Sequence, residues 1–179
     1  DQVYSANVYI NSSTISEALE KEAQIVLSGR VSDPGLALGP CIYEFNWNES
    51  DYNLLAAGTL AGHITECGAQ CTGGNYSRWQ DVPDLADIGY PIIEMRSDGI
   101  FCITKHKGSG GLVNRETIGE QVLYEMGDPE HYISPDVCVD FTSFNLADMG
   151  NNRVEVTNVK GSKPTDTYKV SISYFAGYK

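Results

Sequence analysis

The fold depends first on the segment DYNLLAAGTLAGHITECGAQC, residues 51–71, which is crowded with alanine and glycine. Small side chains let a neighbouring backbone approach closely, so we expect this segment to be a buried helix. Asp51 is expected to cap the helix, which is predicted to run to about Cys71. The face directed at a sheet is predicted to carry Leu54, Ala57, Leu60, Ala61, Ile64 and Gly68.

Upstream of this helix, the hydrophobic pattern predicts a parallel βαβ unit. Residues 6–10 are expected to form a strand, residues 15–23 a helix, and residues 24–29 (QIVLSG) a second strand. The continuous apolar run of QIVLSG is typical of a strand that is buried on both faces. Two strands joined through a helix lie parallel, so a parallel layer is implied, and a short helix over 36–45 follows it.

Downstream, the pattern predicts antiparallel structure. Residues 92–96 and 100–105 are expected to pair as a hairpin around the Ser97-Asp98-Gly99 turn. Apolar residues also alternate with polar ones on both sides of the Gly150-Asn151-Asn152 turn, which indicates further strands. These alternating segments are 137–144, 152–159 and 168–175.

Two connecting segments complete the predicted organisation. Residues 73–91 form a long loop of the kind that is usually functional or a lid. A helix with a Thr117–Glu120 capping box is expected to end at Gly127. We therefore expect an α/β fold, with a parallel βαβ layer and a β-rich antiparallel C-terminal portion, as a single α/β domain over residues 1–179.

Composition excludes several classes of partner. The 179 residues carry a net charge of −12, and residues 1–90 hold 12 acidic against 3 basic side chains, so nucleic acid is not an expected partner. No apolar run reaches the ~18 residues of a membrane span, so no membrane partner is expected. Five cysteines are an odd number and lie mostly in apolar runs, which favours a reducing compartment and predicts a cytoplasmic protein.

The first group of candidate functional residues is His63, Cys67 and Cys71, spaced four residues apart. Both residue types bind zinc, but three ligands strung over two helical turns are too spread to converge on one ion. We therefore predict no metal and no cofactor, and expect the cysteines to pack in the core. His63 and Glu66 are polar residues on a buried helix, which need partners or a cleft, so they are the candidate acid–base residues.

Two glycine-rich stretches are candidate anion-binding sites. Thr72-Gly73-Gly74-Asn75 follows the helix. Its two glycines can simply terminate the helix, or they can in addition leave backbone N–H groups accessible to a ligand. Gly108, Ser109, Gly110 and Gly111 follow Lys105 and Lys107 and precede a helix, an arrangement that suits phosphate or carboxylate. The alternative for this second stretch is a solvated flexible turn.

A third candidate is Arg30 with Asp33, just past the predicted strand 24–29. Ligands of open α/β sheets collect at such strand ends. This pair is either a structural clamp or a group that orients the substrate, with Asp33 able to take part in catalysis.

Several of these motifs occur in an order that resembles the acyclic terpene utilization protein family (AtuA-like). They are GRVSDPGLALGP, LLAAGTLAGHITECGAQCTGGN, VPDLADIGYPIIEM, GSGGLV and PDVCVDFTSFNL, which together span nearly the whole chain. Members of that family are longer, so the resemblance implies that this chain is an interior portion of such a protein. It also implies a role in the breakdown of acyclic isoprenoids through acyl-CoA intermediates, but it carries over no catalytic residue.

Two functions of different class follow. The first is an enzyme of the lyase or hydratase type that acts on a CoA thioester or a related branched-chain anionic acid. His63, Glu66 and Asp33 would catalyse the reaction, and Arg30 and the two glycine stretches would bind the substrate. The alternative is a non-catalytic subunit or scaffold for pathway enzymes, binding through exposed Tyr76 and Trp79. A homo-oligomer fits either function, and a metal-dependent lyase using His63 and Cys67 is a weaker third hypothesis.

Overall fold

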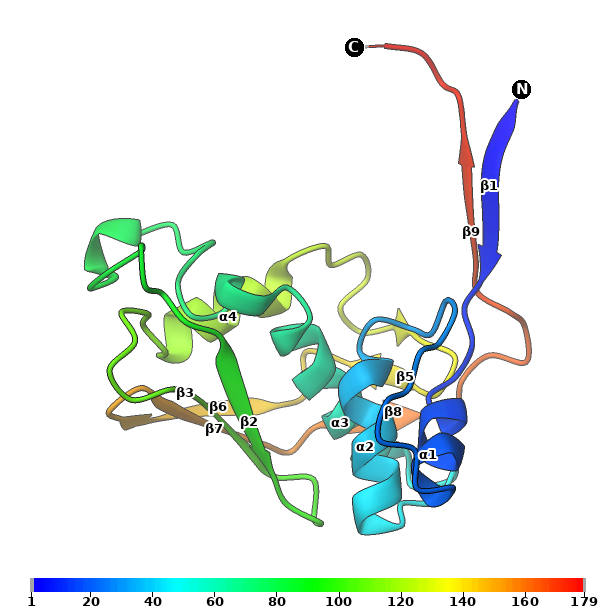
Figure 1. Cartoon of the computed structure of the whole chain (residues 1–179), viewed down its shortest axis with the longest axis horizontal. Helices are drawn as coiled ribbons and strands as arrows, with labels where there is room; N and C mark the ends of the chain where they lie inside the picture. The colour runs from blue at the N-terminus through cyan, green and yellow to red at the C-terminus, as the bar shows by residue number, and fades with distance from the viewer. Residues whose placement is uncertain (1, 179) are drawn as a thin grey trace.

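The computed structural model describes residues 2–178 (Figure 1). Four α-helices lie within this range: α1 (Ser13–Glu20), α2 (Gly35–Phe45), α3 (Tyr52–Thr65) and α4 (Arg115–Leu123). The strands of the same range are β1 (Val3–Val8), β2 (Pro91–Met95), β3 (Phe101–Lys105), β4 (Tyr132–Ile133), β5 (Cys138–Asp140), β6 (Asn145–Gly150), β7 (Arg153–Thr157), β8 (Lys160–Ser162) and β9 (Val170–Tyr174). Two short 3-10 turns, Gly68–Gln70 and Trp79–Asp81, follow α3.

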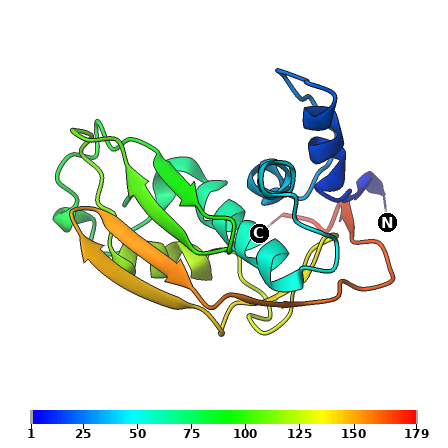
Figure 2. The same cartoon turned by 90° about the horizontal axis from the view of Figure 1, so that it is seen from below.

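Helix α3 is the centre of the hydrophobic core. Every residue from Leu55 to Ile64 is buried, so the helix is enclosed on all sides, as its small and apolar composition predicts. The α-helix ends at Thr65, not near Cys71, and the chain continues through the Gly68–Gln70 turn. Figure 2 shows the four-stranded sheet on one side of α3, and α1 and α2 on the other.

Two glycines one helical turn apart explain why α2 can pack closely against α3. A Cβ atom on Gly62 would lie 2.3 Å from the carbonyl oxygen of Pro34, and one on Gly58 would lie 2.6 Å from Leu38. The backbone of Pro34 and the side chain of Leu38 therefore occupy the space that a larger side chain at either position would need. The small residues of α3 are thus explained by helix–helix packing as well as by contact with the strands.

All strand pairings of the three sheets are antiparallel. The four-stranded sheet has the order β2-β3-β7-β6, and the three-stranded sheet has the order β4-β5-β8. The hairpin β2–β3 and the turn at residues 150–152 between β6 and β7 confirm the sequence prediction. Gly99, with φ of +80°, and Gly150, with φ of +73°, supply the left-handed backbone of these two turns.

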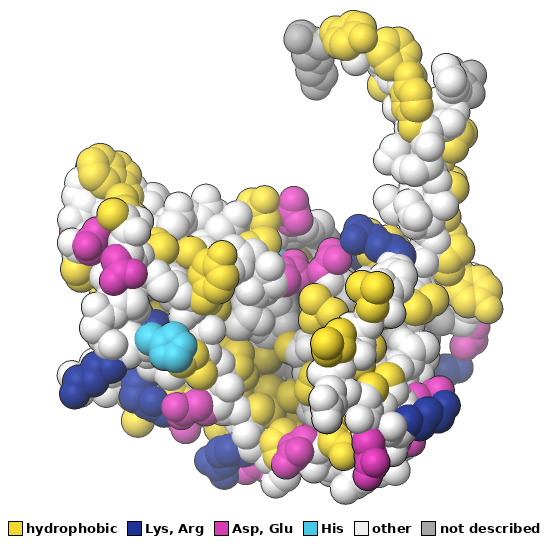
Figure 3. Space-filling model, viewed as in Figure 1, with side chains coloured by type: hydrophobic (Ala, Val, Ile, Leu, Met, Phe, Trp, Pro, Cys, Tyr) yellow, Lys and Arg dark blue, Asp and Glu magenta, His cyan; other side chains and the backbone are white. Residues whose placement is uncertain are grey.

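A two-stranded arm extends away from this core. Strand β1 pairs with β9 at the other end of the chain, and both strands run outward side by side (Figure 1). All six residues of β1 are exposed, and hydrophobic side chains cover much of the arm in Figure 3. The arm therefore has paired backbones but buries little apolar surface.

The predicted parallel βαβ layer is not present in the described residues. The segment 24–29 forms no strand, and Ile25 and Leu27 are 89% and 97% exposed. Parallel pairing is limited to one bridge between Ile10 and Val31. The prediction was wrong because a strand buried on both faces needs layers above and below it, and nothing in the described residues covers this segment.

The start of α4 also differs from the prediction. Asn114 is the N-cap residue: its side chain accepts from the backbone N–H of Thr117, and the Thr117 hydroxyl accepts from the Asn114 N–H. The capping box is therefore Asn114–Thr117 and not Thr117–Glu120. Glu120 instead binds the loop after α3, as described below.

Candidate functional site

The polar residues at the C-terminal end of α3 form an unusual pair. The His63 side chain is 2% exposed, and its Nδ1 lies 3.5 Å from Oε1 of Glu66, whose side chain is 15% exposed. The other ring nitrogen, Nε2, lies 3.2 Å from the carbonyl oxygen of Val122, which can only accept, so Nε2 is the protonated nitrogen. The ring also packs against Tyr132 and Phe141, with centroids 5.6 and 5.3 Å away.

This geometry creates a place for one additional proton. With Nε2 protonated, the neutral ring presents Nδ1 as an acceptor toward a carboxylate, which is also an acceptor. Nδ1 has no hydrogen-bond partner although it is buried, and buried polar atoms normally find one. A proton added to either His63 or Glu66 would join the two groups, which is the property that an acid–base pair requires.

Tyr132 packs against His63, and its hydroxyl is affected by the negative charges of two carboxylates. Burial raises the pKa of the Tyr132 hydroxyl, and the negative charges of Glu66 and Asp33 raise it further. Asp33 accepts from Arg30 Nη1 at 3.2 Å, and Arg30 Nη2 donates to the Tyr9 hydroxyl at 2.8 Å. The hydrogen bond to Tyr9, and then the charge of Asp33, raise the pKa of Arg30, so the guanidinium stays charged.

These residues define what we term the Tyr132 cluster. Its members are Tyr9, Arg30, Asp33, His63, Glu66, Glu125, Tyr132 and Lys169. A cavity of about 420 Å³ opens beside the cluster and is lined by Glu125, Tyr132 and Lys169 with the neighbouring loops. The Lys169 ammonium lies 5.6 Å from the centre of the Tyr132 ring and donates to the carbonyl of Ile133. The cavity therefore gives a small molecule access to the edge of the cluster.

The cysteines near the cluster are not activated nucleophiles. Burial raises the pKa of the Cys67 thiol, and the charge of Glu66 adds to this, while burial raises the pKa of Cys71 to about 12. All five cysteines are free. Within residues 2–178, no group of three or more His, Cys, Asp or Glu side chains is placed to hold a metal ion, so the metal-dependent hypothesis has no ligand set there.

The two glycine stretches meet each other in the structure. The Leu112 N–H donates to the carbonyl of Thr72, and the Gly110 N–H donates to the carbonyl of Asp87. A Cβ atom on Gly110 would lie 2.5 Å from the Asp84 carbonyl oxygen, and one on Gly111 would lie 2.3 Å from that of Ile88. Close packing of the 73–91 loop thus accounts for these two glycines without a ligand.

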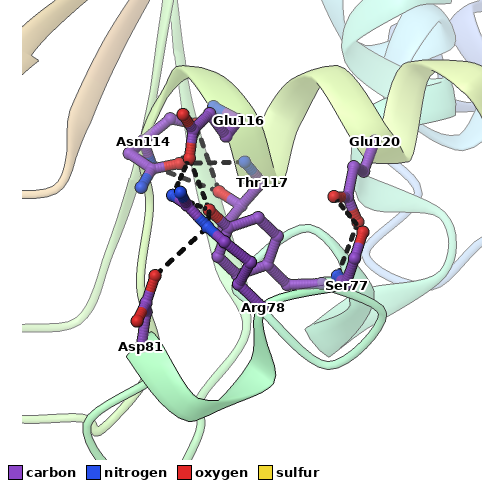
Figure 4. A network of polar contacts seen from close by, with 8 residues as sticks. Ser77, Arg78, Asp81, Asn114, Glu116, Thr117 and Glu120 are labelled. Carbon is purple, nitrogen blue, oxygen red and sulfur yellow. Dashed lines mark hydrogen bonds and ion pairs between the residues drawn. The ribbon is translucent and has the colours of Figure 1, made fainter.

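The 73–91 loop is also bound to α4 by side chains (Figure 4). Glu120 accepts from the backbone N–H of Ser77 at 2.8 Å and from its hydroxyl, and Arg78 pairs with Glu116. Tyr76 donates its hydroxyl to Glu116 and is buried, whereas Trp79 is exposed. The prediction that both aromatic residues are exposed is therefore wrong for Tyr76.

A second hollow lies at one end of the four-stranded sheet. It has a volume of about 610 Å³ and is lined by Ile92, Glu94, Thr104, Lys105, His106, Lys107, Gly108, Asn151, Asn152 and Arg153. We term it the basic cleft. It contains Lys105 and Gly108 from the predicted anion-binding loop, together with the β6–β7 turn, which the sequence predicted as a turn but not as part of a site.

The predicted site residues thus divide into two groups. His63 packs against Tyr132 and pairs with Glu66, and Arg30, paired with Asp33, lies over the Tyr9 ring, which shares Lys169 with Tyr132. The second group lies on and against the 73–91 loop, where Gly73 packs against Val82, Gly74 packs against the Ala69 carbonyl, and Asn75 is exposed. The same loop packs on Gly110 and Gly111. Lys105 Nζ donates to the Ser109 carbonyl at 2.5 Å. Sequence reasoning missed Tyr9, Tyr132, Lys169 and Arg153, because no local pattern marks them.

Comparison with known proteins identifies one family. The family model described as "Acyclic terpene utilisation family protein AtuA" matches residues 1–179. No curated protein and no solved structure gives a significant match to the chain. In the described residues, none of the helices is long and apolar enough to cross a membrane.

Proposed function

The chain belongs to the acyclic terpene utilisation family AtuA, and from this premise we propose that it acts on an acyl-CoA thioester or a related branched-chain anionic acid. The observation that carries this proposal is the His63–Glu66 pair next to Tyr132, a buried arrangement able to take up one proton. The proposed chemistry is proton transfer of the lyase or hydratase type. It needs neither a nucleophilic cysteine nor a metal.

The burial of each group decides its role in the proposed reaction. His63 is too enclosed to touch a substrate, so it serves as a positioning residue that holds Glu66 and shares its proton. Glu66 is more exposed and acts as the base. Tyr132 keeps its hydroxyl proton at neutral pH, because its pKa is raised, and serves as a hydrogen-bond donor.

For addition of water to an α,β-unsaturated thioester, the proton balance is simple. Glu66 takes a proton from water as the water oxygen bonds to the β-carbon and the electrons of the C=C π bond move to the α-carbon. The α-carbon then receives that proton from Glu66, so the carboxylate is restored. Arg30, half exposed and fixed by Tyr9 and Asp33, is positioned to orient the anionic or carbonyl end of the substrate. Of the predicted anion-binding residues, Lys105 and Gly108 line a hollow and remain the proposed holders of the distant anionic group, whereas Gly73, Gly74, Gly110 and Gly111 are filled by packing.

Turnover assays test this proposal. Methyl-branched enoyl-CoA esters and their 3-hydroxy counterparts are supplied to the purified chain, and the conjugated thioester is followed by its ultraviolet absorbance. Glu66→Gln is expected to lower kcat by about 10²–10⁴-fold with little change in melting temperature. His63→Asn is expected to shift the pH profile of kcat, because it removes the partner that shares the proton.

The matched control is Glu44→Gln, which changes an exposed carboxylate on α2. It is expected to leave turnover unchanged. If Glu66→Gln turned over substrate as fast as the unmodified chain, the acid–base role would be wrong.

One observation favours the second candidate function, a non-catalytic subunit or scaffold for pathway enzymes. The β1–β9 arm exposes five large apolar side chains, those of Val3, Val8, Val170, Ile172 and Tyr174. An exposed apolar surface of this kind commonly marks an interaction site. Such a surface is typical of an interface with another protein. Capture of a stoichiometric pathway enzyme that is lost on Ile172→Lys, with no binding of any CoA ester, would favour this function over catalysis.

A further inference from the structure

The basic cleft brings together two hairpins that are far apart in the sequence. Strand β3 pairs with β7, and Ile103 lies opposite Val154, so the end of β3 and the start of β7 lie side by side. The loop after β3 supplies Lys105, His106 and Lys107, and β7 begins with Arg153. Figure 3 shows Lys and Arg side chains gathered near a histidine at this end of the sheet.

The charge of this cleft is opposite to that of the chain. Three permanent cations, Lys105, Lys107 and Arg153, line a hollow in a protein whose net charge is −12. The only carboxylate among the lining residues is Glu94, and it pairs with Arg153. The three cations repel one another and Glu94 offsets only part of that repulsion, so an anion bound in the cleft would be stabilised electrostatically.

Much of the cleft is held in place before any ligand arrives. Lys105 Nζ donates to the Ser109 carbonyl at 2.5 Å, which ties the cation to its own loop. The Ser109 N–H donates to the His106 carbonyl, closing a turn in which Gly108 has φ of +94°. Asn152 accepts from the Val113 N–H at 2.8 Å, which anchors the opposite wall.

Open space at Gly108 distinguishes this part of the loop from the neighbouring glycines. A Cβ atom on Gly108 would meet no heavy atom within 4 Å, whereas one on Gly110 would collide with Asp84. The loop is therefore open at Gly108, on the cleft, and closed at Gly110 and Gly111. An anion would be held by side chains across the two hairpins and not by the N–H groups of the closed glycines.

We propose that the basic cleft binds the phosphate groups of a nucleotide-type ligand, with Lys107 and Arg153 as the principal contacts. This inference rests on the proposed function in one respect: the nucleotide end of a CoA thioester would be that ligand. Three cations around a hollow of about 610 Å³ suit a multiply charged phosphate better than a single carboxylate. The phosphate takes the place of Glu94 as the partner of Arg153.

Calorimetric titration of the whole chain with CoA tests the proposal, with dephospho-CoA, pantetheine and inorganic phosphate as the comparison ligands. Lys107→Ala and Arg153→Ala are each expected to weaken CoA binding about tenfold, as lost hydrogen bonds to a charged group do. Glu94→Gln is expected to strengthen it, because Arg153 loses its competing partner. Pantetheine, which lacks the nucleotide, is expected not to bind in the cleft.

Lys163→Ala is the matched control, since Lys163 is an exposed lysine that lines a different hollow. It is expected to leave CoA affinity unchanged. Equal CoA affinity in the Lys107→Ala and Arg153→Ala variants and the unmodified chain, or weaker binding in Glu94→Gln, would overturn the inference.

The test separates this inference from the proposed function. If the cleft variants weaken CoA binding while Glu66→Gln leaves turnover intact, the phosphate site stands and the catalytic proposal fails. If Glu66→Gln abolishes turnover while the cleft variants bind CoA normally, the phosphate site fails and the catalytic proposal stands. Binding of inorganic phosphate as tight as that of CoA would overturn the assignment to a nucleotide ligand.

Discussion

Helix α3 and the β1–β9 arm are both regular and rich in apolar residues, yet they differ completely in burial. Ten consecutive residues of α3, Leu55–Ile64, are buried, whereas all six residues of β1 are exposed. The arm has its backbone hydrogen bonds but few side-chain contacts. An isolated two-stranded ribbon is marginally stable in water, so we expect burial to contribute more than backbone pairing to the stability of this molecule.

The largest predicted difference between the two regions comes from removing one large apolar side chain from each. Leu60→Ala in α3 is expected to lower the free energy of unfolding by about 3 kcal/mol, because it leaves a cavity at a fully buried position. Ile172→Ala in the arm is expected to change it by less than about 0.5 kcal/mol. Urea denaturation of both variants checks this, and similar losses in the two would contradict the comparison.

A smaller effect is expected where the core meets the 73–91 loop. Gly110→Ala places a Cβ atom against the backbone of Asp84, so we expect a loss of about 1–3 kcal/mol through overpacking. The control is Gly119→Ala within α4, where nothing lies within 4 Å of the new Cβ. Alanine there is expected to stabilise the helix by up to about 1 kcal/mol.

Thermal unfolding of these two variants measures both effects. A lower melting temperature for Gly110→Ala and a higher one for Gly119→Ala would show that glycine is required at position 110 because the 73–91 loop packs on it. Equal shifts would mean that the loop moves away at little cost and that Gly110 has another role.

The smallest predicted effect lies at the joint between the arm and the core. Asp136 accepts from the backbone N–H and the hydroxyl of Ser12, just before α1. Burial raises the pKa of Asp136 above its usual value of 3.8, although the two hydrogen bonds oppose this. Its contribution to stability is therefore full below pH 3.8 and is lost as the pH rises through the raised pKa.

Asp136→Asn removes this titration and keeps the shape of the side chain. The unfolding free energy of the variant minus that of the unmodified chain is expected to increase as the pH rises across this range. Urea denaturation at several acidic pH values measures the difference, in which the other carboxylates cancel. A difference that stays constant, or that falls with rising pH, would show that burial does not raise the pKa of Asp136.

Local patterns predicted much of the core and about half of the candidate site. The composition of α3 indicated burial, and glycine and asparagine turns located the β2–β3 and β6–β7 hairpins, because positive φ values restrict the residue type. His63 and Glu66 were chosen because polar groups on a buried helix need partners. Arg30 and Asp33 were chosen because ligands collect at strand ends, although the strand expected before them is not formed. The sequence also predicted a strand at 24–29, which the structure does not form.

The sequence by itself determined the burial of α3 and the positions of the β2–β3 and β6–β7 turns, since these depend on neighbouring residues. Only the tertiary structure decided that Val3 pairs with Tyr174, that Tyr132 packs against His63, and that Arg153 completes the cleft of Lys105. Each of these joins residues far apart in the chain. Many alternative strand pairings satisfy the same local pattern, and only the packing of the whole core selects among them.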